Sequence, residues 1–138
     1  MKLTNKEARE YFKTGKIPQS NAVKKNKFNA KKKLYNGRLY DSTGEADYSA
    51  ELDFLKKAGE VVKIEYQHPI VLKGIKGEHI TTYKIDFRVT FSNGLVEYHE
   101  FKGKETALWR VKWKLAASQY PDYVFVLVKK RGKRFVKM

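Results

Sequence analysis

The sequence predicts an α/β fold in which a mixed β-sheet is flanked by helices. One observation is the alternation of apolar and polar side chains over residues 83–91, which is typical of a half-buried strand. Another is the pair of helical segments at 45–58 and 105–120, which divide the extended segments into a group of three and a last single strand. The predicted core order is therefore helix, three strands, helix and strand.

The N-terminal part predicts a short helix followed by a basic arm. Thr4 and Glu7 form a capping box, which favours a helix over 4–13 that ends at Gly15. The polar and basic residues 19–33 are expected to be mobile without a ligand. We divide the chain into this N-terminal helix and arm at 1–33, a core domain at 34–128 and a basic C-terminal tail at 129–138.

The core domain is expected to begin with a small hairpin that leads into the first core helix. Asn36 and Gly37 favour a tight turn, and Asp41 or Ser42 can cap the helix that Gly59 ends. The expected strands are 34–35 and 39–40 around the turn, 61–72 with a bend near His68 and Pro69, 83–91, a strand from Val96 onward, and 123–128; a loop is expected at 74–77.

Charge indicates a polyanionic partner. The chain has 138 residues with 30 Lys and Arg against 15 Asp and Glu, a formal net charge of +15, which favours nucleic acid. No apolar run approaches membrane-spanning length and no signal-peptide core follows the N-terminus, so we expect a soluble intracellular protein that binds no membrane. The expected phosphate contacts are Lys24, Lys25, Lys27, Lys31, Lys32, Lys33 and Arg38 near the start, and Lys129, Lys130, Arg131, Lys133, Arg134 and Lys137 near the end.

Three charged residues on neighbouring strands form the candidate catalytic group. In the alternation over 83–91, Asp86 lies on the polar face. Glu100 and Lys102 are two residues apart on the next strand and therefore share one face, while Phe101 points the other way. Whether Asp86 joins them depends on how the two strands pair.

The connection between the strands decides this pairing. A two-residue Asn93-Gly94 turn would set Glu100 opposite Phe87 and leave the two acids on opposite faces. A three-residue loop over 92–94, with Gly94 in the left-handed conformation, sets Asp86 directly opposite Glu100. We choose this second register, which also brings together apolar residues of the two strands: Ile85 with Phe101, and Phe91 with Leu95.

Two opposed carboxylates repel each other unless a proton or a cation lies between them. Oxygen donors in a chain without Cys favour Mg²⁺ or Mn²⁺ over zinc. Lys102 beside such an ion could orient or help deprotonate a water and neutralise charge on a phosphate. The alternative is a solvated Asp-Glu-Lys cluster on an exposed strand face.

Other site chemistries find no matching pattern in the sequence. The three histidines are scattered without metal-ligand spacing, and no Ser-His-Asp or Cys-His arrangement is identifiable. The loop at 74–77 lacks the Walker pattern, so no nucleotide cofactor is expected. Trp109 and Trp113 are four residues apart, a spacing that favours core packing over base stacking.

An ordered set of short motifs runs from Leu39 to Val128. It consists of Tyr40-Asp41-Ser42 with Glu45, then Gln67, Tyr83-Lys84-Ile85-Asp86-Phe87, Glu100-Phe101-Lys102-Gly103, and the helix with Trp109, Lys112 and Lys114 before Tyr120-Pro121. With these motifs the chain resembles the PD-(D/E)xK nuclease superfamily, and within it small phage- and prophage-encoded endonucleases similar to Holliday junction resolvases. The superfamily's usual Pro before the first catalytic Asp is replaced here by Ile85.

The resemblance implies a restriction-endonuclease-like core and divalent-metal-dependent hydrolysis of DNA phosphodiester bonds. Asp86, Glu100 and the backbone carbonyl of Phe101 would hold Mg²⁺ or Mn²⁺, and Lys102 would act on the attacking water. Glu45 would complete the acidic shell directly or through a water. The helical wheel allows Glu51 as a competitor, and the matching motif favours Glu45. The accessory residues are Gln67 at the metal or phosphate, and Lys112 and Lys114 at the DNA backbone.

The resemblance also implies branched DNA as the substrate, in phage recombination or replication, together with a homodimer and a cytoplasmic location in the bacterial host. Two alternatives stay open. One is a non-catalytic nucleic-acid-binding protein that makes no use of the acids, and the other is a sequence-specific, restriction-like endonuclease with the same chemistry.

Overall fold

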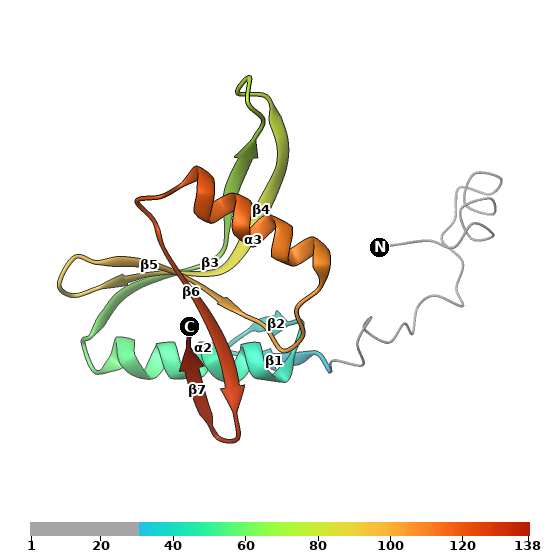
Figure 1. Cartoon of the computed structure of the whole chain (residues 1–138). Helices are drawn as coiled ribbons and strands as arrows, with labels where there is room; N and C mark the ends of the chain where they lie inside the picture. The colour runs from blue at the N-terminus through green and yellow to red at the C-terminus, as the bar shows by residue number, and fades with distance from the viewer. Residues whose placement is uncertain (1–30) are drawn as a thin grey trace, which may run out of the picture. The chain divides into compact units, whose positions relative to one another are not determined.

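A mixed β-sheet accompanied by two helices forms the part of the chain that the computed structural model describes, residues 31–138 (Figure 1). The helix predicted over 4–13 and the basic residues Lys24, Lys25 and Lys27 lie outside this range. The strand order is β3-β4-β5-β6-β7, antiparallel except for the parallel pair β5 and β6. The strands are β3 (Val61–Lys73), β4 (His79–Phe91), β5 (Val96–Phe101), β6 (Val124–Arg131) and β7 (Arg134–Lys137). The predicted α/β class with a mixed sheet is confirmed.

A two-stranded hairpin, β1 (Lys33–Tyr35) and β2 (Arg38–Tyr40), precedes the first of these helices. Its turn residues Asn36 and Gly37 both have positive φ, 49° and 78°. Two left-handed residues in a row give a turn whose twist matches that of a β-hairpin, which is why Asn-Gly predicted it correctly.

Both helices begin after a residue whose side-chain hydroxyl caps the first turn. The first helix, α2 (Thr43–Lys57), starts after Ser42, whose hydroxyl accepts the Glu45 N–H at 3.1 Å. The second, α3 (Ala107–Gln119), starts after Thr106, which accepts the Trp109 N–H at 3.1 Å. Because α3 connects β5 to β6, it provides the crossover that parallel strands need.

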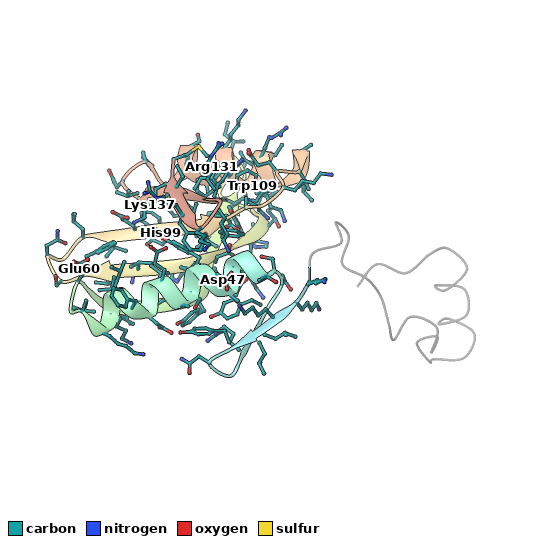
Figure 2. All side chains as sticks on the ribbon, turned by 90° about the horizontal axis from the view of Figure 1, so that it is seen from below. Asp47, Glu60, His99, Trp109, Arg131 and Lys137 are labelled. Carbon is teal, nitrogen blue, oxygen red and sulfur yellow. The ribbon has the colours of Figure 1, made fainter. Side chains whose placement is uncertain are left out.

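The two helices cover opposite faces of β5 (Figure 1). Phe101 is buried in a cluster with Tyr48 of α2, whereas Tyr98 is buried in a cluster with Trp109 of α3. Side chains three positions apart on a strand point to opposite faces. His99 is on the α2 side, where it is fully buried inside the body (Figure 2) and hydrogen-bonds the Tyr48 hydroxyl through Nδ1.

The side chains of β4 switch at Asp86 from the face of the sheet covered by α3 to the face covered by α2. Tyr83 and Ile85 are buried with α3, but Phe87 and Val89, which are at positions of the same parity, are buried with α2. A regular strand would place all four on one face. The prediction that Ile85 lies against Phe101 is therefore wrong, because this change of face puts the two side chains in different clusters.

A bend in β3 accompanies this change. Gln67 lies between Tyr66 and His68, which pair with Phe87 and Ile85 of β4. It has φ 49°, a left-handed conformation that residues other than Gly rarely adopt. The predicted bend near His68 and Pro69 is thus confirmed at the preceding residue. Pro69 is tolerated inside the strand because β3 is an edge strand of the sheet.

The prediction of a basic tail at 129–138 is wrong. The segment completes β6 and forms β7, with Gly132 at φ 63° in the turn between them. Phe135 packs against the cluster that contains Tyr48 of α2. The many lysines and arginines around Phe135 favoured an exposed tail, and the sequence contains no local signal for this contact. Within the described residues, neither helix is long and apolar enough to cross a membrane.

Candidate functional site

The turn between β4 and β5 has the three-residue form that the candidate site requires. The paired residues include Phe87 with His99 and Thr90 with Val96, which is the predicted register. Gly94 has φ 91°, and its N–H donates to the Phe91 carbonyl at 3.0 Å. Continued by one residue, this register sets Asp86 opposite Glu100.

The backbone of β5 holds the Asp86 side chain. The Phe101 N–H donates to Asp86 Oδ2 at 2.9 Å, and the Gln67 amide donates to Oδ1 at 3.2 Å. Asp86 and Glu100 are only 8% and 3% exposed. The alternative of a solvated cluster on an exposed strand face is therefore wrong for these two acids.

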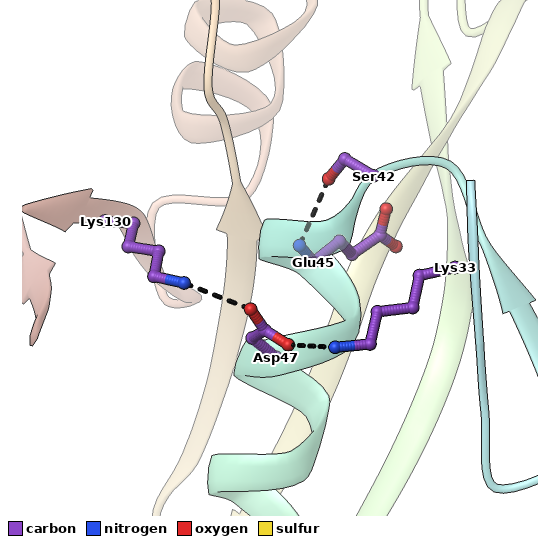
Figure 3. A network of polar contacts seen from close by, with 5 residues as sticks. All are labelled: Lys33, Ser42, Glu45, Asp47 and Lys130. Atoms are coloured by element: carbon purple, nitrogen blue, oxygen red, sulfur yellow. Dashed lines mark hydrogen bonds and ion pairs between the residues drawn. The ribbon is translucent and has the colours of Figure 1, made fainter. Parts of the chain in front are cut away.

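The first turn of α2 brings Glu45 to the same place. The Ser42 cap fixes where the helix begins (Figure 3). Gly44 lies so close to β5 that a Cβ added to it would be 2.3 Å from a ring carbon of Phe101. Glu45 is only 8% exposed, and its Oε1 is 3.5 Å from Gln67 Nε2. Glu45 therefore lies on the buried face of α2.

The structure distinguishes between Glu45 and Glu51, the two acids of α2 that the sequence allowed as the third carboxyl group of the site. Glu51 is exposed on α2, whereas Glu45 is buried beside Asp86. Gln67, predicted as an accessory residue, holds both buried acids from the strained position in β3. Strain of this kind is concentrated at functional sites in proteins.

Burial and the neighbouring charges raise the pKa values of all three carboxyl groups. Burial, followed by the charges of Asp86 and Asp41, raises the pKa of Glu45 from its ordinary 4.5 to about 8. Burial and the Asp86 charge raise the pKa of Glu100 to about 9. Burial also raises the pKa of Asp86, against the effects of the Glu100 side chain and the Phe101 N–H. Charge repulsion and desolvation thus act together on this group.

Lys102 is the cation that offsets this repulsion. Its charge lowers the pKa of each of the three acids. The side chain is partly buried, and its Nζ lies 5.5 Å from the centre of the Trp109 ring. The structure therefore brings together the four residues predicted as catalytic: Glu45, Asp86, Glu100 and Lys102.

The donors at this site fit a hard divalent cation. Among residues 31–138, no three His, Asp or Glu side chains are already arranged as a set of ligands around one point. The groups present at the site are carboxylate oxygens, the donor type that Mg²⁺ and Mn²⁺ prefer. A bound cation would relieve the repulsion that raises the pKa values of Glu45 and Glu100.

A pocket of about 200 Å³ opens beside the acids. The β1–β2 hairpin supplies one wall of it, and the guanidinium carbon of Arg38 lies 4.0 Å from the centre of the Tyr66 ring. This stacking fixes a positive group near the mouth of an acidic pocket. The lining residues are Arg38, Leu39, Tyr40, Asp41, Glu45, Tyr66, Gln67 and Asp86.

Comparison with known protein families matches residues 25–134, more than half of the chain, to a family described as a protein of unknown function (DUF1064). The chain belongs to the DUF1064 family. Searches of the curated proteins and of the solved structures found no significant match. The DUF1064 match contains the four residues of the candidate site, and it names no activity for them.

Part of the basic surface in the DUF1064 range is held in ion pairs. Asp47 of α2 pairs with Lys33 of β1 at 2.7 Å and with Lys130 of β6 at 3.0 Å (Figure 3). Lys129 pairs with Glu105. Three predicted phosphate contacts therefore already have an acidic partner. Among the other predicted contacts that the structure describes, Lys31, Lys32, Arg38, Lys114, Arg131, Lys133, Arg134 and Lys137 are exposed and Lys112 is partly exposed.

Sequence reasoning missed two polar groups at the DUF1064 site. The Tyr83 hydroxyl donates to Glu100 Oε2, and the Trp109 indole N–H donates to the Tyr83 hydroxyl at 3.0 Å. The alternation over 83–91 places Tyr83 on the apolar strand face, and the spacing of Trp109 and Trp113 favours core packing. The available signal was the polar end of each side chain, since a buried Tyr or Trp generally needs a hydrogen-bond partner.

Proposed function

We propose that this protein is a divalent-metal-dependent endonuclease that hydrolyses DNA phosphodiester bonds. The observation that carries the proposal is the meeting of three buried carboxyl groups from three elements, Glu45, Asp86 and Glu100, beside one lysine. Burying three carboxyl groups together costs stability when no cation is bound, because desolvation and mutual repulsion disfavour their charged forms. The net charge of +15 supports a polyanionic substrate.

Each group has a distinct task in this proposal. Asp86, Glu100 and the Phe101 carbonyl would hold Mg²⁺ or Mn²⁺, with Glu45 as a ligand directly or through a water. The bound ion would activate water and neutralise charge on the phosphate. Lys102 would orient the attacking water and stabilise the negative charge that grows on the phosphate oxygens. Gln67 would keep two of the carboxylates in place through its two hydrogen bonds.

The finer proposal follows the resemblance to PD-(D/E)xK nucleases. The observed order α2, β3, β4, β5, α3, β6 supports a restriction-endonuclease-like core, because it places the acids on adjacent strands and on the preceding helix. We propose branched DNA as the substrate, as in the resolvase-like enzymes encoded by phages and prophages. Symmetric cutting of two strands would need two sites, which a homodimer would supply.

The test compares the full-length protein with Lys102→Ala on linear duplex, single-stranded, flap and four-way junction DNA. Each substrate is incubated with Mg²⁺, Mn²⁺ or EDTA. We expect cutting that needs the metal and is lost in Lys102→Ala. Lys84→Ala is the matched control, because Lys84 is an exposed lysine on β4 outside the site.

Binding by wild type without cutting, under every metal and on every substrate, would reject the proposal and leave a basic binding protein. Cutting that Lys102→Ala retains would reject the assigned role of this lysine. Preference for junctions over duplex would support the resolvase-like substrate, whereas cutting of duplex at one sequence would support the restriction-like alternative.

A further inference from the structure

The Trp109 side chain is linked to both members of the Glu100 and Lys102 pair, to Lys102 directly and to Glu100 through Tyr83. Its indole N–H donates to the Tyr83 hydroxyl at 3.0 Å, and that hydroxyl donates to Glu100 Oε2. Its ring face lies 5.5 Å from Lys102 Nζ. A single residue of α3 is therefore linked to the acid through a hydrogen-bond chain and to the base through a cation–π contact.

The chain of hydrogen bonds has a fixed direction. An indole N–H can only donate, so the Tyr83 oxygen accepts from Trp109. The single hydroxyl proton of Tyr83 is then left for Glu100 Oε2. This arrangement directs a donor at one carboxylate oxygen of Glu100 and leaves the other oxygen for a different partner.

Trp109 is itself held rigidly. Its backbone N–H donates to the Thr106 cap at 3.1 Å, in the first turn of α3. Its ring stacks on Trp113, with centroids 5.4 Å apart and an angle of 28° between the planes. It is only 7% exposed. A side chain fixed in this way can position the groups that touch it.

We infer that Trp109 is a positioning residue that sets the orientation of Glu100 through Tyr83 and holds the ammonium group of Lys102 over its ring face. The inference deepens the proposed function and rests on it, since it assigns to α3 the alignment of the Glu-x-Lys pair with the metal. It separates two actions of one side chain: the indole N–H acts on Glu100, and the ring acts on Lys102.

Three substitutions separate these actions. Trp109→Phe keeps a ring under Lys102 but removes the N–H. Tyr83→Phe removes the hydroxyl that contacts Glu100. Trp109→Leu removes both the N–H and the aromatic face. Mn²⁺ affinity of the full-length variants is measured by calorimetry, and kcat and KM are measured on the substrate that wild type cuts.

We expect Tyr83→Phe to weaken Mn²⁺ binding about tenfold, as for loss of a hydrogen bond to a charged group. Trp109→Phe should weaken Mn²⁺ binding by less. The double variant that carries both Tyr83→Phe and Trp109→Phe should match Tyr83→Phe alone, because both residues act through one chain of hydrogen bonds. Trp109→Leu should in addition lower kcat without raising KM, because it releases Lys102. Additive effects in the double variant, or Mn²⁺ binding unchanged in both single variants, would overturn the inference.

Tyr120→Phe is the matched control for a structural effect. Its hydroxyl donates to the Val71 carbonyl at 2.6 Å, so this variant also loses a tyrosine hydrogen bond beside α3, but one that does not touch the acids. Thermal unfolding is recorded for every variant. If Tyr120→Phe weakens Mn²⁺ binding as much as Tyr83→Phe does at equal loss of stability, the positioning role is refuted.

A readout without metal separates failure of this inference from failure of the proposed function. The chain has two tryptophans, so Trp113→Phe leaves Trp109 as the single tryptophan, which excitation near its long-wavelength absorption edge selects over tyrosine. In that background, Lys102→Met and Tyr83→Phe should each shift the Trp109 fluorescence. No shift with either variant overturns the inference even if wild type cuts DNA. If both variants shift the emission while wild type neither binds Mn²⁺ nor cuts, the proposed function fails and the positioning role falls with it.

Discussion

Replacing Glu100 with Gln should stabilise the metal-free protein at high pH. The pKa of Glu100 in the folded protein is raised to about 9, mainly by burial and then by the Asp86 charge, whereas the ordinary value is 4.5. A group with a raised folded pKa contributes stability that is fully present below its unfolded pKa and is lost as pH rises through the folded pKa. The loss therefore begins near pH 4.5 and continues to about pH 9.

The size of this effect follows from the shift. While the folded state holds the proton and the unfolded state does not, the free energy of unfolding falls by about 1.4 kcal/mol per pH unit. Between pH 5 and pH 8 this amounts to about 4 kcal/mol for one carboxyl group. Glu100→Gln has no proton to lose at this position, and the Gln side-chain oxygen can still accept the Tyr83 hydrogen bond.

The assay is urea unfolding in EDTA at pH 5, 6, 7 and 8, for wild type and Glu100→Gln. The free energy of unfolding of Glu100→Gln should exceed that of the wild type by an amount that grows with pH. Glu51→Gln, an exposed acid on α2, is the control and should follow wild type. Parallel pH dependence of wild type and Glu100→Gln would refute the argument that Glu100 is protonated in the folded protein.

A divalent cation should oppose this loss of stability in the wild type. Mg²⁺ at one hundred times its dissociation constant should add about 2.7 kcal/mol to the unfolding free energy of wild type. Glu100→Gln should gain much less, because it lacks one of the proposed ligands. The gain for wild type should increase with pH, since the ion displaces protons from the acids.

Three further predictions concern α2. Leu52→Ala should lower the free energy of unfolding by about 2–4 kcal/mol in urea titrations, because Leu52 is fully buried, while Phe54→Ala at a 69% exposed position should change it by less than about 0.5 kcal/mol. Asp47→Asn should cost under about 1 kcal/mol because its ion pairs are partly exposed. Because Asp47→Asn frees Lys33 and Lys130, the variant should bind DNA more tightly at low salt. An unchanged DNA affinity at low salt, measured by fluorescence anisotropy, would contradict this. Gly44→Ala should destabilise by about 1–3 kcal/mol despite the better helix propensity of Ala, because the new methyl group meets the Phe101 ring; a gain in melting temperature would show that α2 can move away.

Local sequence chemistry predicted much of the fold and the pairing of the site. The Ser92-Asn93-Gly94 loop specifies the register because Gly94 can take the left-handed conformation, and the register alone puts Asp86 opposite Glu100. Asn36-Gly37 predicted the first hairpin, and Ser42 the start of α2. Each of these signals depends on backbone preferences within a few residues, so no distant contact can easily override it.

Contacts between distant segments decided the rest. The change of face in β4 at Asp86 accompanies the left-handed conformation of Gln67 in the neighbouring strand β3, and the alternation of residues along β4 carries no information about that conformation. The basic residues at the C-terminal end were predicted as a tail because their charge is visible in the sequence, while the packing of Phe135 is not.

The sequence by itself thus determined which residue types the site contains and the strong positive charge, and it favoured the strand register that the structure shows. Only the tertiary structure decided that Glu45 rather than Glu51 meets the strand acids, and that Tyr83 and Trp109 join them. The physical reason is that burial is a property of the whole packed domain. The same carboxyl group has an ordinary pKa when exposed and a raised one when neighbours from other elements exclude water from it.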